Sequence, residues 1–270
     1  MKTSLIISTY NRPDALRVCL DSIRLQTILP DEIVIGDDGS INETKDTIDA
    51  MRVDLGIPIK HVWHEDKGFQ LAQMRNKSFD AASGDYIIEI DGDIMMNKHF
   101  IEDHLYAAQP GFYVKGGRVN LGKRLSEQIC REGRSRKITP LSPGIESKRE
   151  NGFRLKALAL YLQRRYRKYS SVGLGCNMSF FKKDCIAING YDNDYEGWGG
   201  EDIDFARRLQ SYGLKKKYLK FSGIVYHLWH EDKYMHNKEK NFSRMRESQD
   251  QKLIRVPNGF EEVRGDYKIL

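Results

Sequence analysis

Short apolar runs alternate with helix-like segments along the first third of the chain, and this alternation constrains the fold more than any other feature. Between the runs, apolar residues recur at helical spacing, as at Leu16, Leu20 and Ile23. Strands that alternate with helices through short connections form a mostly parallel sheet covered by helices. The sequence therefore predicts an α/β fold. The predicted strands are Ser4–Ser8, Glu32–Ile35, Ile59–Trp63 and Tyr86–Ile90, and the predicted helices include Thr44–Arg52 and Leu71–Ala82.

Polar clusters follow three of the predicted strands, at residues 9–12, 37–40 and 91–93. In sheets of this kind, ligands bind at the carboxyl ends of the strands. We therefore expect the three clusters to form one ligand site. A tight turn is the alternative explanation for residues 37–40, because Asp and Gly are common in turns.

The third cluster contains two carboxylates, Asp91 and Asp93, separated by Gly92. Alternate residues of a strand point the same way, so both carboxylates can project together while the glycine leaves room for a ligand. Such a pair suits Mg²⁺ or Mn²⁺, which prefer oxygen ligands and often share them with substrate phosphates. A charged turn after a buried strand is the alternative.

The composition is that of a soluble globular protein, with 270 residues, 40% hydrophobic and 30% charged. The longest apolar runs are too short to cross a membrane. The first ten residues lack a cleavage site and fit a buried strand better than a signal peptide. The four cysteines are widely spread and predict free thiols in a reducing cytoplasm.

Positive charge is concentrated in one segment. The net charge is +6, but residues 115–170 hold 16 Lys or Arg against 4 Asp or Glu. Such a segment can meet nucleic acid, anionic lipid or a phosphorylated substrate. Within it, Phe153–Tyr169 reads as a basic amphipathic helix, which either lies on an anionic membrane or packs its apolar face on the core.

The last third contains a second group of motifs. Glu201 and Asp202 stand at a predicted helix start, where the helix dipole favours anions. A final strand, Gly223–His227, places His227 at its end, and His230 follows three residues later. Beyond about Asp232 the chain is polar and is expected to be a loosely attached tail.

These segments, taken in order, resemble family 2 glycosyltransferases, on residues 6–12, 32–40, 72–77 and 91–93. The stretch from Trp198 to Asp202 resembles the acceptor-side motif of β-1,4-galactosyltransferases and bacterial chondroitin-type polymerases. The resemblance implies the GT-A (nucleotide-diphospho-sugar transferase) fold, a Rossmann-like, mostly parallel sheet with a smaller acceptor-binding part. It divides the chain into a nucleotide-sugar half (1–110), a variable basic segment (111–170), an acceptor and catalytic half of the same domain (171–232) and a C-terminal tail (233–270).

The resemblance also implies roles on the donor side. Thr9, Tyr10 and Arg12 would line the nucleotide pocket, and Asp37 or Asp38 would accept a hydrogen bond from uracil or ribose. Arg75 would approach the diphosphate or the base, although an arginine on a helix is usually only solvated. Asp91 would face the ribose and metal-bound water beside Gly92.

Asp93 would bind the metal directly, with Asp91 beside it. A third ligand is expected from a histidine near the end of the domain; His227 is favoured for its place at a strand end, and His230 competes. Carboxylate and imidazole together favour Mn²⁺ over Mg²⁺.

On the acceptor side, the resemblance makes Asp202 the general base and gives Glu201 a sugar hydroxyl to hold. Trp198 would stack on a sugar ring, and Gly199 and Gly200 would give backbone freedom. The alternative explanation is that Glu201 and Asp202 are only the acidic first-turn residues of an ordinary helix.

The resulting hypothesis is metal-dependent, inverting transfer of a hexose or N-acetylhexosamine from a UDP-sugar to a hydroxyl of a glycan or lipid-diphosphate-linked saccharide. Galactose or N-acetylgalactosamine is favoured, with glucose and N-acetylglucosamine next. The absence of an anchor or disulfides points to bacterial surface polysaccharide synthesis in the cytoplasm, with peripheral contact on the inner face of the plasma membrane.

The sequence disfavours two other functions. A nucleotidyltransferase would need a Gly-rich, basic phosphate loop after the first strand, which residues 8–12 do not supply. A nucleic-acid-binding protein would leave Asp91, Asp93, Glu201 and Asp202 unexplained, so no nucleic-acid partner is expected.

Overall fold

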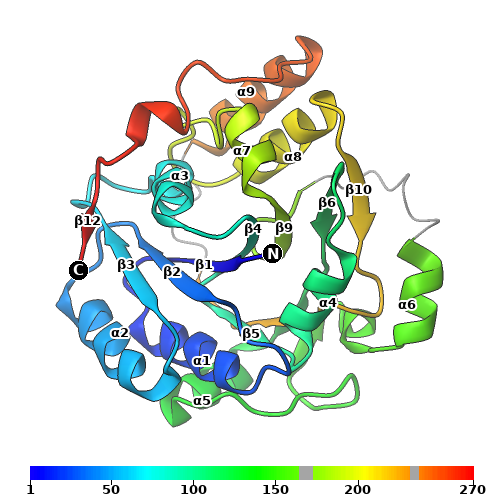
Figure 1. Ribbon diagram of the computed structural model, residues 1–270. Helices are drawn as coiled ribbons and strands as arrows, with labels where there is room; N and C mark the ends of the chain where they lie inside the picture. The colour runs from blue at the N-terminus through cyan, green and yellow to red at the C-terminus, as the bar shows by residue number, and fades with distance from the viewer. Residues whose placement is uncertain (164–172, 232–236) are drawn as a thin grey trace.

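The computed structural model describes residues 1–163, 173–231 and 237–270. Its centre is an eight-stranded sheet with the strand order β10-β6-β9-β4-β1-β2-β3-β12 (Figure 1). The strands are β1 (Thr3–Thr9), β2 (Glu32–Asp37), β3 (Ile59–Trp63), β4 (Tyr86–Asp91), β6 (Phe112–Lys115), β9 (Met178–Phe181), β10 (Lys215–Tyr218) and β12 (Lys268–Ile269).

The four strands predicted from the first third of the chain form the parallel middle of this sheet. β1 pairs in parallel with β2 and with β4, and β2 pairs in parallel with β3. The register sets Thr9 opposite Asp37 and Ser8 opposite Asp91. The three polar clusters therefore meet at one edge of the sheet, as predicted. β9 joins antiparallel to β4 and β6, so later parts of the chain share the same sheet.

Helices cover both faces of the sheet, because alternate strand residues face opposite ways. Leu5 and Ile7 pack in one buried cluster with α1, α2 and α4, whereas Ile6 packs in another with α3, α7 and α8. Figure 1 shows α1 and α2 on one side and α3, α7 and α8 on the other. The helices are α1 (Pro13–Arg24), α2 (Asn42–Leu55), α3 (Leu71–Ala81), α4 (Phe100–Ala107), α5 (Lys123–Glu132), α6 (Lys156–Gln163), α7 (Lys182–Ala187), α8 (Glu201–Ser211) and α9 (Lys238–Asp250).

A second sheet of four strands, ordered β5-β11-β7-β8, lies beside the first. β5 follows β4 after only two residues, Gly92 and Asp93. Asp93 is therefore held at the junction of the two sheets, where Leu228 N–H donates to its carbonyl oxygen at 2.9 Å. The strands are β5 (Ile94–Met96), β7 (Val119–Leu121), β8 (Ile145–Ser147) and β11 (Val225–His227).

The prediction of a loosely attached tail is wrong for residues 237–270. α9 packs against α8, and β12 adds an antiparallel strand to β3. Val256 and Phe260 are 2% and 3% exposed. Some apolar residues of this polar segment, such as Met245 and Phe260, thus enter the core, which its average composition does not reveal. The segment also contains a short 3₁₀ helix, η2 (Glu261–Val263).

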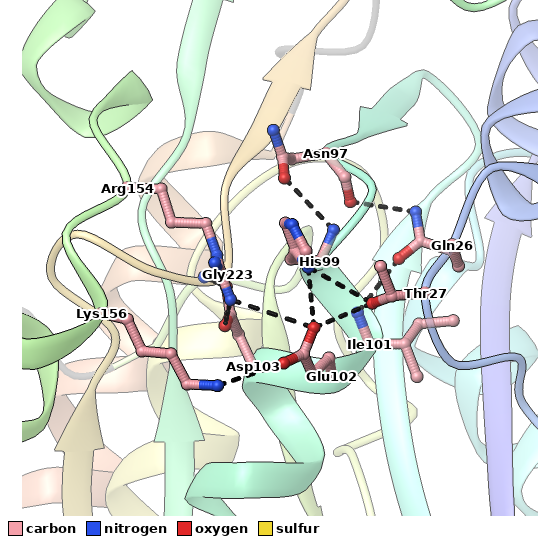
Figure 2. A network of polar contacts seen from close by, with 10 residues as sticks. All are labelled: Gln26, Thr27, Asn97, His99, Ile101, Glu102, Asp103, Arg154, Lys156 and Gly223. Carbon is pink, nitrogen blue, oxygen red and sulfur yellow. Dashed lines mark hydrogen bonds and ion pairs between the residues drawn. The ribbon is translucent and has the colours of Figure 1, made fainter.

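The predicted basic helix 153–169 is present in part. α6 begins at Lys156, and residues 164–169 lie outside the described part of the chain. A polar network joins the start of α6 to α4 (Figure 2). Arg154 binds both oxygens of Asp103 at 2.7 and 3.2 Å, and Lys156 lies 3.3 Å from Glu102. These ion pairs fix one end of α6 to the domain.

No helix in the described ranges is long and apolar enough to span a membrane.

Candidate active site

Three side chains that can bind a metal meet at the junction of the two sheets. Asp93 Oδ1 lies 3.6 Å from His227 Nε2, and Asp93 Oδ2 lies 3.5 Å from His230 Nε2. One ligand atom from each residue lies within 4.8 Å of the other two. We call these three residues the Asp93 cluster. The structure thus brings the predicted aspartate together with both candidate histidines, while Asp91 lies outside the cluster.

The chemistry of the Asp93 cluster fits a divalent cation. Asp93 Oδ1 is buried and has no hydrogen-bond partner among the described residues, so it is available to a metal. Burial lowers the pKa of His227, which favours the neutral imidazole that a metal requires. Burial acts to raise the pKa of Asp93, but His227, Arg12 and His230 outweigh it, and the pKa falls below its ordinary value. The carboxylate therefore stays ionised.

The loop after β1 lies against this cluster. Arg12 Nη1 donates to Asp93 Oδ2 at 3.2 Å, which places a cation beside the metal-binding carboxylate. Tyr10 donates its hydroxyl proton to Asp66 at 2.9 Å. Thr9 is buried beside Gly92, whose N–H donates to Ser8 O at 2.7 Å. The residues predicted to line the nucleotide pocket thus surround the end of β1.

Arg75 on α3 is buried, with 2% of its side chain exposed, so it is not a solvated helix arginine. Its Nη2 lies 3.1 Å from Asp91, its Nη1 lies 3.3 Å from Glu201, and its Nε lies 3.5 Å from Glu89. The ring of Tyr191 lies under the guanidinium at 5.0 Å. Arg75 therefore connects Asp91, at the end of β4, with Glu201, at the start of α8.

The three carboxyl groups around Arg75 have only one positive charge close to them, which is too little to keep all three ionised. Burial raises the pKa of Glu89 to about 7. Burial, with Asp202 next to it, also raises the pKa of Glu201 to about 7. The pKa of Asp91 is raised by burial as well, although Arg75 opposes the shift. One guanidinium among three carboxyl groups leaves Glu89 and Glu201 partly protonated near neutral pH.

Asp37 and Asp38, the candidate nucleotide ligands, are both buried and already bonded to the protein. Asp37 contacts His61 Nε2 at 2.9 Å and accepts from Ser40 N–H at 2.8 Å. Asp38 contacts His64 Nε2 at 2.7 Å and accepts from Gln70 N–H at 2.9 Å. Each carboxylate oxygen can accept a further hydrogen bond, so these contacts leave room for uracil or ribose. A contact with either one stays a prediction.

Asp202 and Glu201 open α8, as the sequence predicts. Asp202 Oδ2 accepts the N–H of Gly175 at 3.0 Å, which ties it to the strand segment entering β9. Glu201 reaches inward to Arg75, and its second oxygen is buried without a hydrogen-bond partner among the described residues. The two neighbouring acids thus point to different surroundings.

The loop before α8 is shaped by glycines and held by α9. Gly199 and Gly200 have φ values of 102° and 93°, which residues with a side chain rarely adopt. Asn241 on α9 donates to the carbonyl of Trp198 at 3.3 Å. The Trp198 ring lies 6.4 Å from that of Phe242 and is 44% exposed. Trp198 thus presents part of its ring to solvent, and its stacking on a sugar ring stays a prediction.

Sequence reasoning missed several residues that shape this site. His61 and His64 orient the two aspartates, and Asn241 fixes the acceptor loop. Arg118, in the basic segment, lies near Asp91 and Asp93. The excess of positive charge pointed to that segment, but no spacing singled out this arginine.

The fold and the site together define a glycosyltransferase of the GT-A type. Residues 4–171 match the family model for glycosyl transferase family 2, and residues 156–231 match that for the N-terminal domain of galactosyltransferase. The chain belongs to glycosyl transferase family 2. The resemblance drawn from the sequence motifs is confirmed.

Curated relatives are similar over most of this chain. Validoxylamine A glucosyltransferase of Streptomyces hygroscopicus subsp. limoneus is 29% identical over 224 residues, which are 78% of this chain and 48% of that protein. Chondroitin synthase of Pasteurella multocida (strain Pm70) is 28% identical over 83% of this chain and 24% of its own length. The chain thus spans about half or less of the length of these relatives.

A solved structure, of GalNAc-T7 with UDP, GalNAc and Mn²⁺, shares the fold. It superposes with a TM-score of 0.67 at 15% identity, over 98% of this chain and 53% of the other.

Proposed function

We propose that this chain transfers a hexose or N-acetylhexosamine from a UDP-sugar, with inversion, to a hydroxyl of a saccharide. The observation that carries the proposal is the pair of contacts of Arg75 with Asp91 and Glu201. Through these contacts, one buried side chain connects Asp91 of the donor-side motif with Glu201 of the acceptor-side motif. A saccharide hydroxyl beside Asp202 would then lie near a donor bound at the strand ends.

Each side chain has a chemical task in this proposal. Asp202 accepts the proton of the attacking hydroxyl as the new glycosidic bond forms. Trp198 offers its exposed face to the acceptor ring, and Glu201 holds a sugar hydroxyl. Asp93, with His227 or His230, would hold a divalent cation, Mn²⁺ in preference to Mg²⁺, which supplies Lewis-acid neutralisation of the departing diphosphate.

The acceptor-side motif favours galactose or N-acetylgalactosamine as the donor sugar, with glucose and N-acetylglucosamine next. The match to the N-terminal domain of galactosyltransferase supports this order. Because one relative is named a glucosyltransferase, glucose and N-acetylglucosamine stay candidates as well.

The first test is a panel of nucleotide sugars, with Mn²⁺ or with EDTA, read out by thermal shift and donor hydrolysis. We expect one UDP-sugar at about 100 times its Kd to raise the Tm by roughly 5 °C or more, because ligand binding stabilises the folded state. EDTA should abolish the shift, since the diphosphate would lose its cation. Stabilisation by a nucleoside triphosphate, and by no nucleotide sugar, would instead support a nucleotidyltransferase.

We also propose that the acceptor is a lipid-linked saccharide at the inner face of the plasma membrane, where α6 contacts anionic lipid. Phe153, Leu155, Leu158 and Tyr161 are each 40–53% exposed around this helix. Lys156 lies among them, and the sequence continues with Arg164, Arg165, Arg167 and Lys168. Exposed apolar side chains on a helix, with basic residues close by in the sequence, are typical of binding at an anionic membrane surface.

Neutralising the basic residues after α6 should reduce vesicle binding. We expect the quadruple change of Arg164, Arg165, Arg167 and Lys168 to glutamine to lower co-sedimentation with anionic vesicles about tenfold or more, because each charge contributes to attraction at such a surface. The matched control neutralises Lys98, Lys240, Arg246 and Lys252, which are exposed elsewhere. Equal binding by the two variants would exclude a specific role for this segment.

A further inference from the structure

Arg118 lies between β6 and β7 and has donors that the protein leaves unused. Its Nη1 donates to the sulfur of Cys176 at 3.7 Å. Its Nε is buried and has no hydrogen-bond partner among the described residues. Within the described ranges Arg118 forms no ion pair, although Asp91 and Asp93 are near enough to affect its charge. A half-buried guanidinium of this kind is costly unless something binds it.

Strand pairing brings Arg118 near the Asp93 cluster, because β7, which begins at the next residue, pairs with β11 and sets Asn120 opposite His227. Burial acts to lower the pKa of Arg118, but Cys176, Asp91 and Asp93 outweigh burial and raise it. In return, its charge helps to lower the pKa of His227. Arg118 therefore contributes fixed positive charge to the space where the metal and the donor's phosphates are expected.

The backbone around Arg118 is fixed by a set of asparagine contacts. Asn177 donates to Gly117 O at 2.7 Å and accepts the N–H of Gly116 on its own carbonyl at 2.9 Å. Asn151 donates to the carbonyl of Arg118 at 3.0 Å. A Cβ at position 116 would lie 2.2 Å from the Asn177 side chain, so only glycine allows this approach. The backbone that carries Arg118 is thus held in place by the protein itself.

We propose that Arg118 binds the diphosphate of the nucleotide donor, as a second source of positive charge beside the metal. A guanidinium fits phosphate oxygens with two parallel hydrogen bonds, and its charge cannot be lost by deprotonation. Negative charge grows on the departing diphosphate, so a cation fixed beside it lowers the barrier as well as the Kd. This inference rests on the proposed use of a nucleoside diphosphate sugar.

The test compares UDP with uridine, which has the same base and ribose but no phosphate. In saturating Mn²⁺, we expect Arg118→Gln to raise the Kd of UDP by about 10-fold or more, because hydrogen bonds between charged groups contribute roughly 1.5–3 kcal/mol. The Kd of uridine should stay unchanged. Arg118→Lys keeps the charge without the paired geometry and should give an intermediate value. Arg134→Gln, exposed on the same basic segment, is the matched control.

Each outcome decides something. An unchanged Kd for UDP in both Arg118 variants overturns the inference while leaving the proposed function intact. Equal losses for UDP and uridine also contradict it, since they indicate damage to the pocket as a whole. A higher KM for acceptor with unchanged UDP binding would assign Arg118 to the acceptor instead. Wild-type protein that fails to bind UDP would refute the proposed function itself.

Discussion

Replacing Asp93 by asparagine should abolish Mn²⁺-dependent binding of UDP and lower the transfer rate by about 100-fold or more. Asp93 is the single carboxylate of the Asp93 cluster, and its Oδ1 has no hydrogen-bond partner within the described residues. Asparagine keeps the shape and removes the charge, so the loss is that of an ionic metal ligand. Without the metal, the leaving group loses several kcal/mol of charge stabilisation. The measurement is a Mn²⁺ titration by calorimetry, followed by initial rates.

Asp49→Asn is the control, because Asp49 forms its ion pairs on the exposed surface of α2. The same titration on His227→Ala and His230→Ala identifies which imidazole is a ligand. Undiminished Mn²⁺ affinity in Asp93→Asn would refute the proposed metal site.

Replacing Asp202 by asparagine should lower transfer by about 10²–10⁴-fold and leave the Kd of UDP unchanged. The range is that of a positioned general base, which asparagine cannot replace. Asparagine can still accept the Gly175 N–H, so the start of α8 should keep its geometry. The proposed donor-binding residues lie at the strand ends, so donor binding should not respond.

The measurement pairs a transfer assay with a UDP titration on the same preparation, again with Asp49→Asn for comparison. Full transfer activity in Asp202→Asn would remove it as the base. A matching loss of UDP affinity would instead assign Asp202 a part in the donor site.

Much of the fold could be predicted because periodicity is a local property. Each strand of the parallel middle is a short apolar run, and each helix between has an apolar face, so neither depends on distant contacts. The C-terminal segment shows the limit of such reasoning. Lys268 and Ile269 form a strand only because β3 offers an unpaired edge, and no local pattern announces that partner.

The candidate site divides in the same way. The order of motifs identified the family and brought Asp93 and His227 into consideration together. The contact of Arg75 with Glu201 and the position of Arg118 could not be predicted in this way, because they depend on segments far apart in the chain. Arg75 meets Glu201 across 126 positions. Its buried position is visible only after folding.

The outer strands of the large sheet have a consequence for how copies of this protein behave when crowded. β12 covers the far side of β3, and β10, at the opposite end, begins with three consecutive lysines. A bare edge strand invites pairing with another chain, and lysines hinder that pairing. Growth of the sheet from copy to copy is thus discouraged at both ends, which would allow many molecules to gather on one surface without polymerising.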